Sequence, residues 1–434
     1  GCTVEVYSGR TPEGAVYEGS VTADEQGHFS LDIEGPFSGP ELTAITIDPD
    51  RGTSEFSLRT IGPNARTLIQ RGNEAPVTQI KSLESSELAD NRMGAQFPGF
   101  GPVETYDYEI YPRGVKQARV AIEPVEPEGV DWERSEFEVL PGQDAVIDRL
   151  VENGVEVTYV LMFWDKATWP GGEGAPCARF RTKGEVKRYL EFVRFTVEHF
   201  KDRVDYYEIW NEPDIGWYCT KYIRVPDYVR LVKRVAPVIR SVHPEAKIVV
   251  GGASKTSYRD AREWLFGVLG SDAMPLVDVV SWHPMYGTSP AVKQERAYYE
   301  RYPSFVKRIK RTAEANGFRG EYRANEIGYA TSETMGGGHA RGYAPAVAAK
   351  YEAREILRHL GLDIGVGVPG DNYVIRRLAT LMAGAEPVDL DVKVRSKAKD
   401  VVHYSFSTPD GGHLVAFWTN GKAAEVDRGR RATV

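Results

Sequence analysis

The fold is decided by residues 204–254, which contain VDYYEIW (204–210), VPDYVRLVKRVAPVIRSV (225–242) and KIVVGGAS (247–254) in succession. The first and last runs are short and apolar, as strands are when both faces of a parallel sheet are covered. The middle run repeats apolar residues every three or four positions, which is the period of an amphipathic helix. The segment therefore predicts a strand, a crossover helix and a second strand.

The same alternation extends in both directions from about Asn91. The other expected strands are MGAQF (93–97), KQARVAI (116–122), VEVTYVLMFW (155–164), VDVVSWHP (277–284), GEYRANEIG (320–328) and GLDIGVGV (361–368). The other expected helices include AVIDRLVENG (145–154), VKRYLEFVRFTVEHF (186–200), SFVKRIKRTAEANG (304–317), AAKYEAREILRHL (348–360) and NYVIRRLATLMAG (372–384). Eight strands alternating with helices predict an α/β fold, a (β/α)8 TIM barrel over residues 91–386. A doubly wound open sheet is the competing fold, but it expects a GxGxxG turn after its first strand, and the sequence has none there.

The sequence on both sides of the predicted barrel has the pattern expected of small β-modules. Residues 1–60 contain short runs of alternating apolar and polar residues separated by Gly, Pro and Asp-rich turns, which predict a small antiparallel sandwich. Residues 61–90 lack periodicity and are interpreted as a linker or connecting strands. Residues 387–434 return to strands and predict a partial C-terminal β-domain. The predicted fold is therefore a barrel with small flanking β-sandwich-like domains.

Composition excludes several classes of protein. The chain has 434 residues, a net charge of −8, 41% apolar and 27% charged residues, which are ordinary values for a globular protein. The acidic balance disfavours nucleic acid as a partner. The most apolar stretch, 155–164, is far shorter than the roughly 20 residues of a spanning helix, so no membrane span is expected. Only 3 Cys are present, so no disulfide framework carries the fold. The oligomeric state is left open.

Two carboxylates follow strands on opposite sides of the predicted barrel. Glu212 follows the fourth strand and Glu326 follows the seventh. The C-terminal ends of barrel strands form the usual active-site face, so the two should meet there. A pair of carboxylic acids at such a site is what glycoside hydrolysis requires, one as general acid and one as nucleophile. The sequence therefore predicts a glycosidase acting on an oligo- or polysaccharide, with no obligatory cofactor.

Aromatic residues and a histidine surround these carboxylates in the sequence. Trp164, Trp169 and Trp217 follow strands 3 and 4 and are predicted to be sugar platforms, whereas Trp210 and Trp282 are expected to pack beneath the site. A metal site is not expected, because the sequence has no HExxH or Cys-x-x-Cys motif and its His residues are scattered.

The segments WNEPD (210–214) and NEIG (325–328) resemble the acid/base and nucleophile motifs of clan A retaining glycoside hydrolases. The similarity is greatest to the family 39 type, which includes β-xylosidases and α-L-iduronidase relatives, and it covers roughly residues 90–385. The resemblance implies a double displacement, most often at a β-linked bond. It implies these roles: Glu212 as acid/base, Glu326 as nucleophile, Asn211 as donor to the sugar 2-hydroxyl, Arg119 as the cation beside the nucleophile, and His283 and Tyr286 as walls of the reacting subsite.

Further features lead to secondary expectations. Glu208, inside strand 4, is interpreted as a buried partner for an Arg rather than a catalytic group. Cys177 and Cys219 lie in neighbouring loops, and the sequence leaves open whether they form a disulfide or remain two free thiols. The glycine run at 336–338 is interpreted as a flexible loop, not a phosphate loop. The alternative function is a catalytically inactive carbohydrate-binding or cell-surface scaffold.

The flanks and the eighth strand suggest a chain cut from a longer protein. The first 60 residues resemble part of an immunoglobulin-like module of extracellular bacterial proteins, in which a strand like that of Cys2 is usually internal. Residues 361–374 lack the Trp that families of this type place after strand 8, so residues are expected to be missing there and at the C-terminus. We therefore expect a secreted or cell-surface, multidomain protein.

Overall fold

The computed structural model of the chain describes residues 2–9, 16–24, 29–31, 41–48, 52–53, 60–61, 80–96, 114–120, 137, 139, 141–162, 179–215, 222–331, 342–369, 373–425 and 432–433. They fall into two compact units. The smaller consists of residues 1–78, 395–397 and 426–434, and the larger of residues 79–394 and 398–425.

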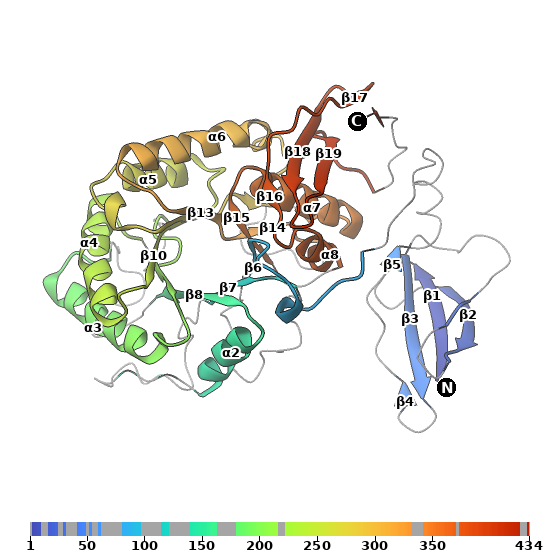
Figure 1. Ribbon diagram of the computed structural model, residues 1–434, viewed down its shortest axis with the longest axis horizontal. Helices are drawn as coiled ribbons and strands as arrows, with labels where there is room; N and C mark the ends of the chain where they lie inside the picture. Colours follow the sequence, from blue (N-terminus) through green and yellow to red (C-terminus); the bar gives the residue numbers. More distant parts are fainter. Residues whose placement is uncertain are drawn as a thin grey trace. The chain divides into compact units, whose positions relative to one another are not determined.

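The larger unit is a closed barrel of eight parallel strands (Figure 1). In chain order the strands are β6 (Met93–Gln96), β7 (Gln117–Val120), β8 (Glu156–Leu161), β9 (Tyr206–Ile209), β10 (Lys247–Ala253), β11 (Val279–Trp282), β13 (Glu321–Ala324) and β15 (Gly365–Pro369). Each strand pairs in parallel with its neighbours in the chain, and β15 closes the ring by pairing with β6. The predicted (β/α)8 barrel is confirmed.

Helices surround the strands on the outside (Figure 1). They are α2 (Pro141–Glu152), α3 (Lys183–Phe200), α4 (Val225–Val242), α5 (Arg259–Leu269), α6 (Arg296–Ala315), α7 (Pro345–Gly361) and α8 (Tyr373–Leu381). In α4 the buried side chains recur every three or four positions, from Tyr228 and Leu231 to Ile239, so one face packs on the strands. Pro226 in the first turn suits the start of this helix, because the backbone N–H that proline lacks has no partner there.

Two helices differ from the sequence prediction. Helix α5 was not among the predicted segments. Helix α6 begins at Arg296 rather than at 304 and continues through Pro303. Proline inside a helix removes a backbone hydrogen bond, but Tyr299 and Tyr302 in the preceding turn are fully buried, and their burial offsets that loss.

The barrel interior is polar at the end where the strands begin. Arg323 of β13 donates to Thr158 Oγ1 of β8 at 3.4 Å and to Glu156 at 3.0 Å, and its guanidinium lies 4.2 Å from the centre of the Tyr206 ring. Since β8 and β13 are not neighbours in the ring, these contacts cross the interior. An ion-paired layer therefore crosses the interior at this end of the barrel.

A three-stranded antiparallel sheet belongs to the same unit as the barrel. It consists of β16 (Glu386–Pro387), β18 (Val401–Ser407) and β19 (His413–Thr419) in that order. Phe406 of β18 is fully buried in the barrel's hydrophobic core, and Arg358 of α7 donates to Asn420 Oδ1 at 2.7 Å. The sheet thus packs against α7.

The smaller unit contains an antiparallel sheet in the order β2-β1-β3-β4, with β5 also paired to β3. The strands are β1 (Thr3–Gly9), β2 (Val16–Thr22), β3 (Glu41–Asp48), β4 (Gly52–Thr53) and β5 (Thr60–Ile61). Val4 and Val6 are buried and alternate with more exposed neighbours, as the period-2 pattern predicts. Two short strands, β17 (Arg395–Ser396) and β20 (Ala432–Thr433), also pair antiparallel. The immunoglobulin-like likeness and the domain boundaries remain predictions.

Candidate active site

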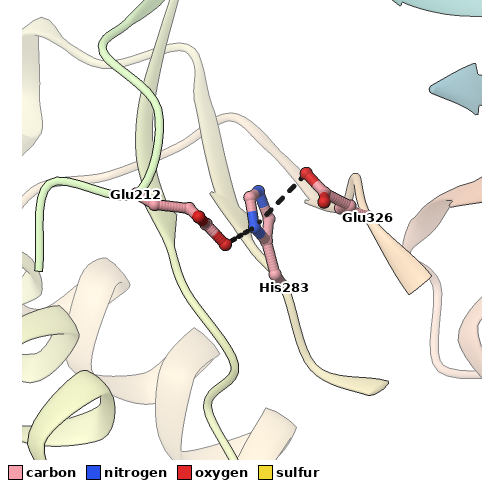
Figure 2. A group of neighbouring side chains, drawn as sticks. All are labelled: Glu212, His283 and Glu326. Atoms are coloured by element: carbon pink, nitrogen blue, oxygen red, sulfur yellow. Dashed lines mark hydrogen bonds and ion pairs between the residues drawn. The ribbon is translucent and has the colours of Figure 1, made fainter. Parts of the chain in front are cut away.

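Three titratable side chains meet at the ends of barrel strands (Figure 2). Glu212 follows β9, His283 follows β11 and Glu326 follows β13. His283 Nδ1 lies 3.1 Å from Glu212 Oε1 and 3.4 Å from Glu326 Oε2. One oxygen of each carboxylate and the imidazole nitrogen all lie within 4.8 Å of one another. The two predicted catalytic carboxylates are therefore close together, bridged by an imidazole.

The backbone around Glu212 adopts an unusual conformation for residues with side chains. Trp210 and Glu212 have φ angles of 70° and 47°, in the left-handed region that L residues rarely occupy. Each such residue costs of order 1–3 kcal/mol and is found mostly at functional sites. The Glu212 backbone N–H donates to Gly252 O at 3.0 Å, which holds this turn against the next strand. The turn places the Glu212 carboxylate over the barrel mouth, with 19% of its side chain exposed.

His283 is held from both sides and is fully buried. Its backbone N–H donates to Ala253 O at 2.9 Å, and its carbonyl accepts from Thr256 N at 3.0 Å. Burial alone would lower the pKa of the imidazole, but the negative charge of Glu326 and the hydrogen bond to Glu212 outweigh burial, so the pKa is raised above its ordinary value. The two carboxylates thus favour the protonated form of this imidazole, whose Nδ1 lies between them.

Glu326 has a raised pKa despite its cationic neighbours. Burial is the largest cause and raises the pKa of the carboxyl, and the Glu212 carboxylate raises it further. His283 and Arg119 act in the opposite direction, since each stabilises the ionised form. Burial and Glu212 therefore destabilise the ionised carboxylate of Glu326, whereas His283 and Arg119 stabilise it.

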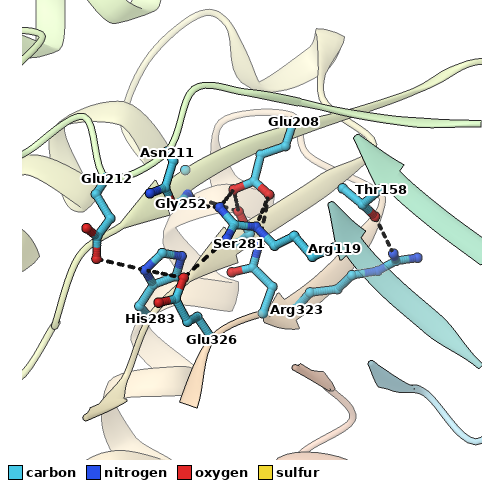
Figure 3. A network of polar contacts seen from close by, with 12 residues as sticks. Arg119, Thr158, Glu208, Asn211, Glu212, Gly252, Ser281, His283, Arg323 and Glu326 are labelled. Carbon is cyan, nitrogen blue, oxygen red and sulfur yellow. Dashed lines mark hydrogen bonds and ion pairs between the residues drawn. The ribbon is translucent and has the colours of Figure 1, made fainter. Parts of the chain in front are cut away.

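Arg119 of β7 links this pair to a second layer beneath it (Figure 3). Its Nη1 donates to Glu326 Oε2 at 3.2 Å and its Nη2 donates to Asn211 Oδ1 at 2.7 Å. On the other side, its Nε lies 2.6 Å from Glu208 Oε2. The predicted cation beside Glu326 is thus in place, and Glu208 is the buried arginine partner that the sequence indicated.

The contact with Arg119 also fixes the orientation of Asn211. Because a guanidinium can only donate, the atom that faces it must be the amide oxygen of Asn211. The amide nitrogen is then turned away from Arg119. Asn211 can therefore act as a hydrogen-bond donor, which is the property expected of a residue that binds a sugar hydroxyl.

The tryptophans predicted to lie beneath the site are both fully buried. Trp210 contacts Phe180 and Tyr189 edge-on. Trp282 Nε1 donates to Tyr302 Oη at 3.0 Å, and Tyr302 Oη lies 2.7 Å from His359 Nε2. Burial lowers the pKa of His359 to about 3, so this imidazole is neutral and accepts the tyrosine proton. This chain of hydrogen bonds holds the residue that precedes His283.

Tyr286 lies at the rim of the same group. It belongs to the short strand β12 (Met285–Tyr286), which pairs in parallel with β14 (Ile327–Gly328) directly after Glu326. Its ring centre is 6.3 Å from that of His283. The predicted strand-6 pair is therefore brought next to the carboxylates.

Several predicted residues fall outside the described part of the chain. These are the sugar platforms Trp164, Trp169 and Trp217, the cysteines Cys177 and Cys219, and the glycines at 336–338. The platforms and the disulfide remain predictions.

Residues to which the sequence analysis assigned no role complete the site. Asn325 Nδ2 donates to Glu208 Oε2 at 3.0 Å, and Ser281 Oγ donates to Glu208 Oε1 at 3.3 Å. Asp214 accepts a hydrogen bond from Ser254 N at 2.7 Å, and burial raises the pKa of its carboxyl. A signal existed for Ser281, which lies two positions before His283 and so shares the inward face of its strand.

The spacing of Glu212, His283 and Glu326 would also suit a divalent cation, because each offers one ligand atom within 4.8 Å of the others. We do not assign them as metal ligands. A histidine binds a metal through an unprotonated nitrogen, and the charge of Glu326 and the hydrogen bond to Glu212 raise the pKa of His283, which disfavours that form.

Comparisons with known proteins support the fold. No family model matches the chain, and no curated protein matches it. A family 39 glycoside hydrolase from the gut symbiont Bacteroides cellulosilyticus WH2 is similar over 96% of this chain and 84% of its own, with a TM-score of 0.58 and 15% identity. A conserved exported protein from Bacteroides fragilis has a TM-score of 0.51 and 13% identity over 76% of this chain and 86% of its own.

A third similar structure is the bacterial orthologue of human α-L-iduronidase. It has a TM-score of 0.50 and 15% identity, over 79% of this chain and 64% of its own. At these identities the likeness is one of fold, a barrel with additional β-structure. Within the described residues, no helix combines the length and the apolar content that a membrane crossing requires.

Proposed function

We propose that this chain is a retaining glycoside hydrolase. The observation that carries the proposal is the approach of Glu212 and Glu326, whose nearest oxygens lie within 4.8 Å of one another at the C-terminal face of a (β/α)8 barrel. Retaining enzymes place their two carboxyl groups about 5–5.5 Å apart, whereas inverting enzymes need about 6.5–9.5 Å to admit a water molecule. An approach of one oxygen of each carboxylate within 4.8 Å leaves little room for a water molecule between them, which supports the two-step, covalent route.

The contacts of the two carboxylates support different roles for them. Glu326 accepts from Arg119 and is the more buried of the two, so its ionised form has a fixed cation beside it. Glu212 is more exposed and contacts His283 rather than the guanidinium. A nucleophile must be ionised and a general acid must hold a proton. We therefore assign Glu326 as the nucleophile and Glu212 as the acid/base.

The proposed reaction follows from this assignment. Glu326 attacks the anomeric carbon while Glu212 gives its proton to the departing glycosidic oxygen, which leaves a glycosyl–enzyme ester. Glu212, now ionised, takes a proton from a water molecule as that water attacks the same carbon and releases Glu326. Asn211, with its amide nitrogen free to donate, binds the neighbouring hydroxyl of the sugar.

We also propose that the substrate is an oligo- or polysaccharide with a β-linkage, and that the protein acts outside the cell. The first statement rests on the resemblance of WNEPD and NEIG to clan A enzymes, and the second on the resemblance of residues 1–60 to a module of extracellular bacterial proteins. Trp164, Trp169 and Trp217 are proposed as platforms for the apolar faces of sugar rings.

Trapping the covalent intermediate tests the proposal. An activated 2-fluoro glycoside should label Glu326, as peptide mass spectrometry would show, and Glu326→Gln should abolish labelling. Glu212→Ala should lose about 10²–10⁴-fold in turnover of a substrate with a poor leaving group, because such a bond needs the acid. It should lose far less with an activated leaving group.

Glu263→Gln on the exposed face of α5 serves as the control and should keep wild-type rates. Absence of labelling and of hydrolysis across a panel of glycosides would favour the inactive scaffold instead.

A further inference from the structure

Beneath the proposed catalytic pair lies a second carboxylate, Glu208, which is fully buried in β9. Arg119 donates to it twice, from Nε at 2.6 Å and from Nη2 at 3.2 Å. Asn325 and Ser281 add one hydrogen bond each, at 3.0 and 3.3 Å. These donors come from β7, from the residue after β13 and from β11, so Glu208 ties together three other strands around the ring (Figure 3).

The backbone makes room for this carboxylate. Gly252 of β10 has a φ of +53°, and a Cβ atom there would lie 2.6 Å from Glu208 Oε1. The Gly252 N–H donates to Ser281 Oγ at 2.9 Å. The Ser281 hydroxyl in turn donates its own proton to Glu208 Oε1. The surroundings are thus shaped for a carboxylate at this position.

The consequence for Arg119 is geometric. A guanidinium is planar, so two hydrogen bonds to one carboxylate fix both its position and its plane. The remaining donors then point in set directions, Nη1 to Glu326 Oε2 at 3.2 Å and Nη2 to Asn211 Oδ1 at 2.7 Å. Glu208 therefore determines where Arg119 meets the two residues that contact substrate.

The consequence for charge is equally direct. Glu208 supplies one negative charge against the one positive charge of Arg119, so the layer under the site has no net charge. If Glu208 were neutral, the guanidinium charge would act uncompensated on the site above. The titratable groups that face Arg119 and Glu208 from the surrounding elements are Glu212, Tyr228, His283 and Glu326.

We propose that Glu208 is a positioning residue for the reaction. It holds Arg119 in contact with Glu326 and Asn211, and its negative charge offsets the positive charge of Arg119. The proposal rests on the proposed glycosidase function for its kinetic consequences. Its electrostatic consequences do not need turnover.

Glu208→Gln tests whether the negative charge of Glu208 acts on the site. The variant keeps the shape but leaves Arg119 uncompensated, so anions in the site are favoured and cations disfavoured. Both limbs of the pH profile of kcat/KM should move to lower pH by about one unit, the size expected for one charge several ångströms away. The pKa of His283, measured by NMR on 15N-histidine-labelled protein, should fall in the same variant.

Glu208→Asp tests whether Glu208 sets the position of Arg119. It keeps the charge but withdraws the carboxylate by one methylene, so Arg119 is drawn away from Glu326. Here kcat should fall at least about tenfold while both pH limbs stay in place. This variant remains informative if Glu208→Gln fails to fold, since wild-type kcat in Glu208→Asp would overturn the proposal.

Glu156→Gln is the matched control, because Glu156 also pairs with a barrel arginine but at the opposite end of the strands. It should leave the pH limbs and the His283 pKa unchanged. Unshifted limbs and an unshifted His283 pKa in folded Glu208→Gln would overturn the proposal while the glycosidase assignment stands. If the wild-type enzyme hydrolyses no glycoside, the assignment fails, and the His283 titration still decides the role of Glu208.

Discussion

At the scale of single residues, Glu326 is the proposed nucleophile, and its ionised form is energetically costly. Its carboxylate is buried beside Glu212, and both effects raise its pKa above the ordinary value for Glu. A raised pKa in the folded protein means that ionisation is easier after unfolding. The stability linked to this group is thus fully present at low pH and is lost as the pH rises through the folded pKa.

Glu326→Gln should therefore stabilise the protein at neutral pH while it abolishes turnover. Removing a costly buried charge at a functional site is expected to gain about 0.5–2 kcal/mol. The gain should vanish below about pH 4.3, the ordinary pKa of Glu, where the native carboxyl is protonated in both states. Thermal unfolding of Glu326→Gln and of the wild type, at pH 7 and at pH 3.5, measures the difference in stability at each pH. A variant less stable than the wild type at pH 7 would contradict this account.

At the scale of elements, β10 and β11 approach each other unusually closely under the site. Gly251 has a φ of +120°, and a Cβ atom there would lie 2.2 Å from the backbone oxygen of Ser281. Their ladder shifts register between Val250 and Ala253, just where His283 and the Glu212 turn attach. The glycine is needed because no side chain fits between the two strands.

Gly251→Ala should accordingly separate β10 from β11. We expect a loss of more than about 2 kcal/mol of stability, from strained backbone and overpacking together, and a large fall in kcat. Gly184→Ala in α3 is the matched control, because no atom lies within 4 Å of its added methyl group. It should be neutral or slightly stabilising. Chemical denaturation of the two variants makes the comparison, and equal stabilities would refute the packing argument.

At the scale of the larger unit, the barrel and the sheet of β16, β18 and β19 share a core. Phe406 is fully buried in the barrel's hydrophobic cluster, and the backbone after β19 accepts from Arg354 of α7 at 2.8 Å. The sheet lies against the same helix that carries His359, whose contact with Tyr302 supports Trp282. Barrel and sheet should therefore unfold together.

Phe406→Ala should lower the stability of the whole unit, by about 3–5 kcal/mol for a fully buried aromatic side chain. Phe417→Ala in the neighbouring strand is the control, because that ring is 44% exposed, and its cost should be below about 1 kcal/mol. Loss of near-UV circular dichroism and loss of activity should coincide on heating. A separate, earlier transition confined to the sheet would instead indicate an independent domain.

The order of strands and helices, the place of the two carboxylates and the pairing of Glu208 with an arginine were all readable from the sequence. Parallel strands give apolar runs, helices give a 3.6-residue period, and strand ends of a barrel share one face, so local patterns carry this information. They failed for α5, which no predicted segment covered, and for the start of α6, where buried Tyr299 and Tyr302 carry the helix through Pro303.

The tertiary structure alone decided the rest. His283 was a lone histidine in the sequence. It lies between Glu212 and Glu326, which are more than a hundred residues apart in the chain, as are Arg119 and Glu326. Asn325, Ser281 and Gly252 meet at Glu208 only because the ring closes. A closed barrel converts sequence separation into contact across its interior, and no periodicity along the chain records which inward-facing side chains will touch.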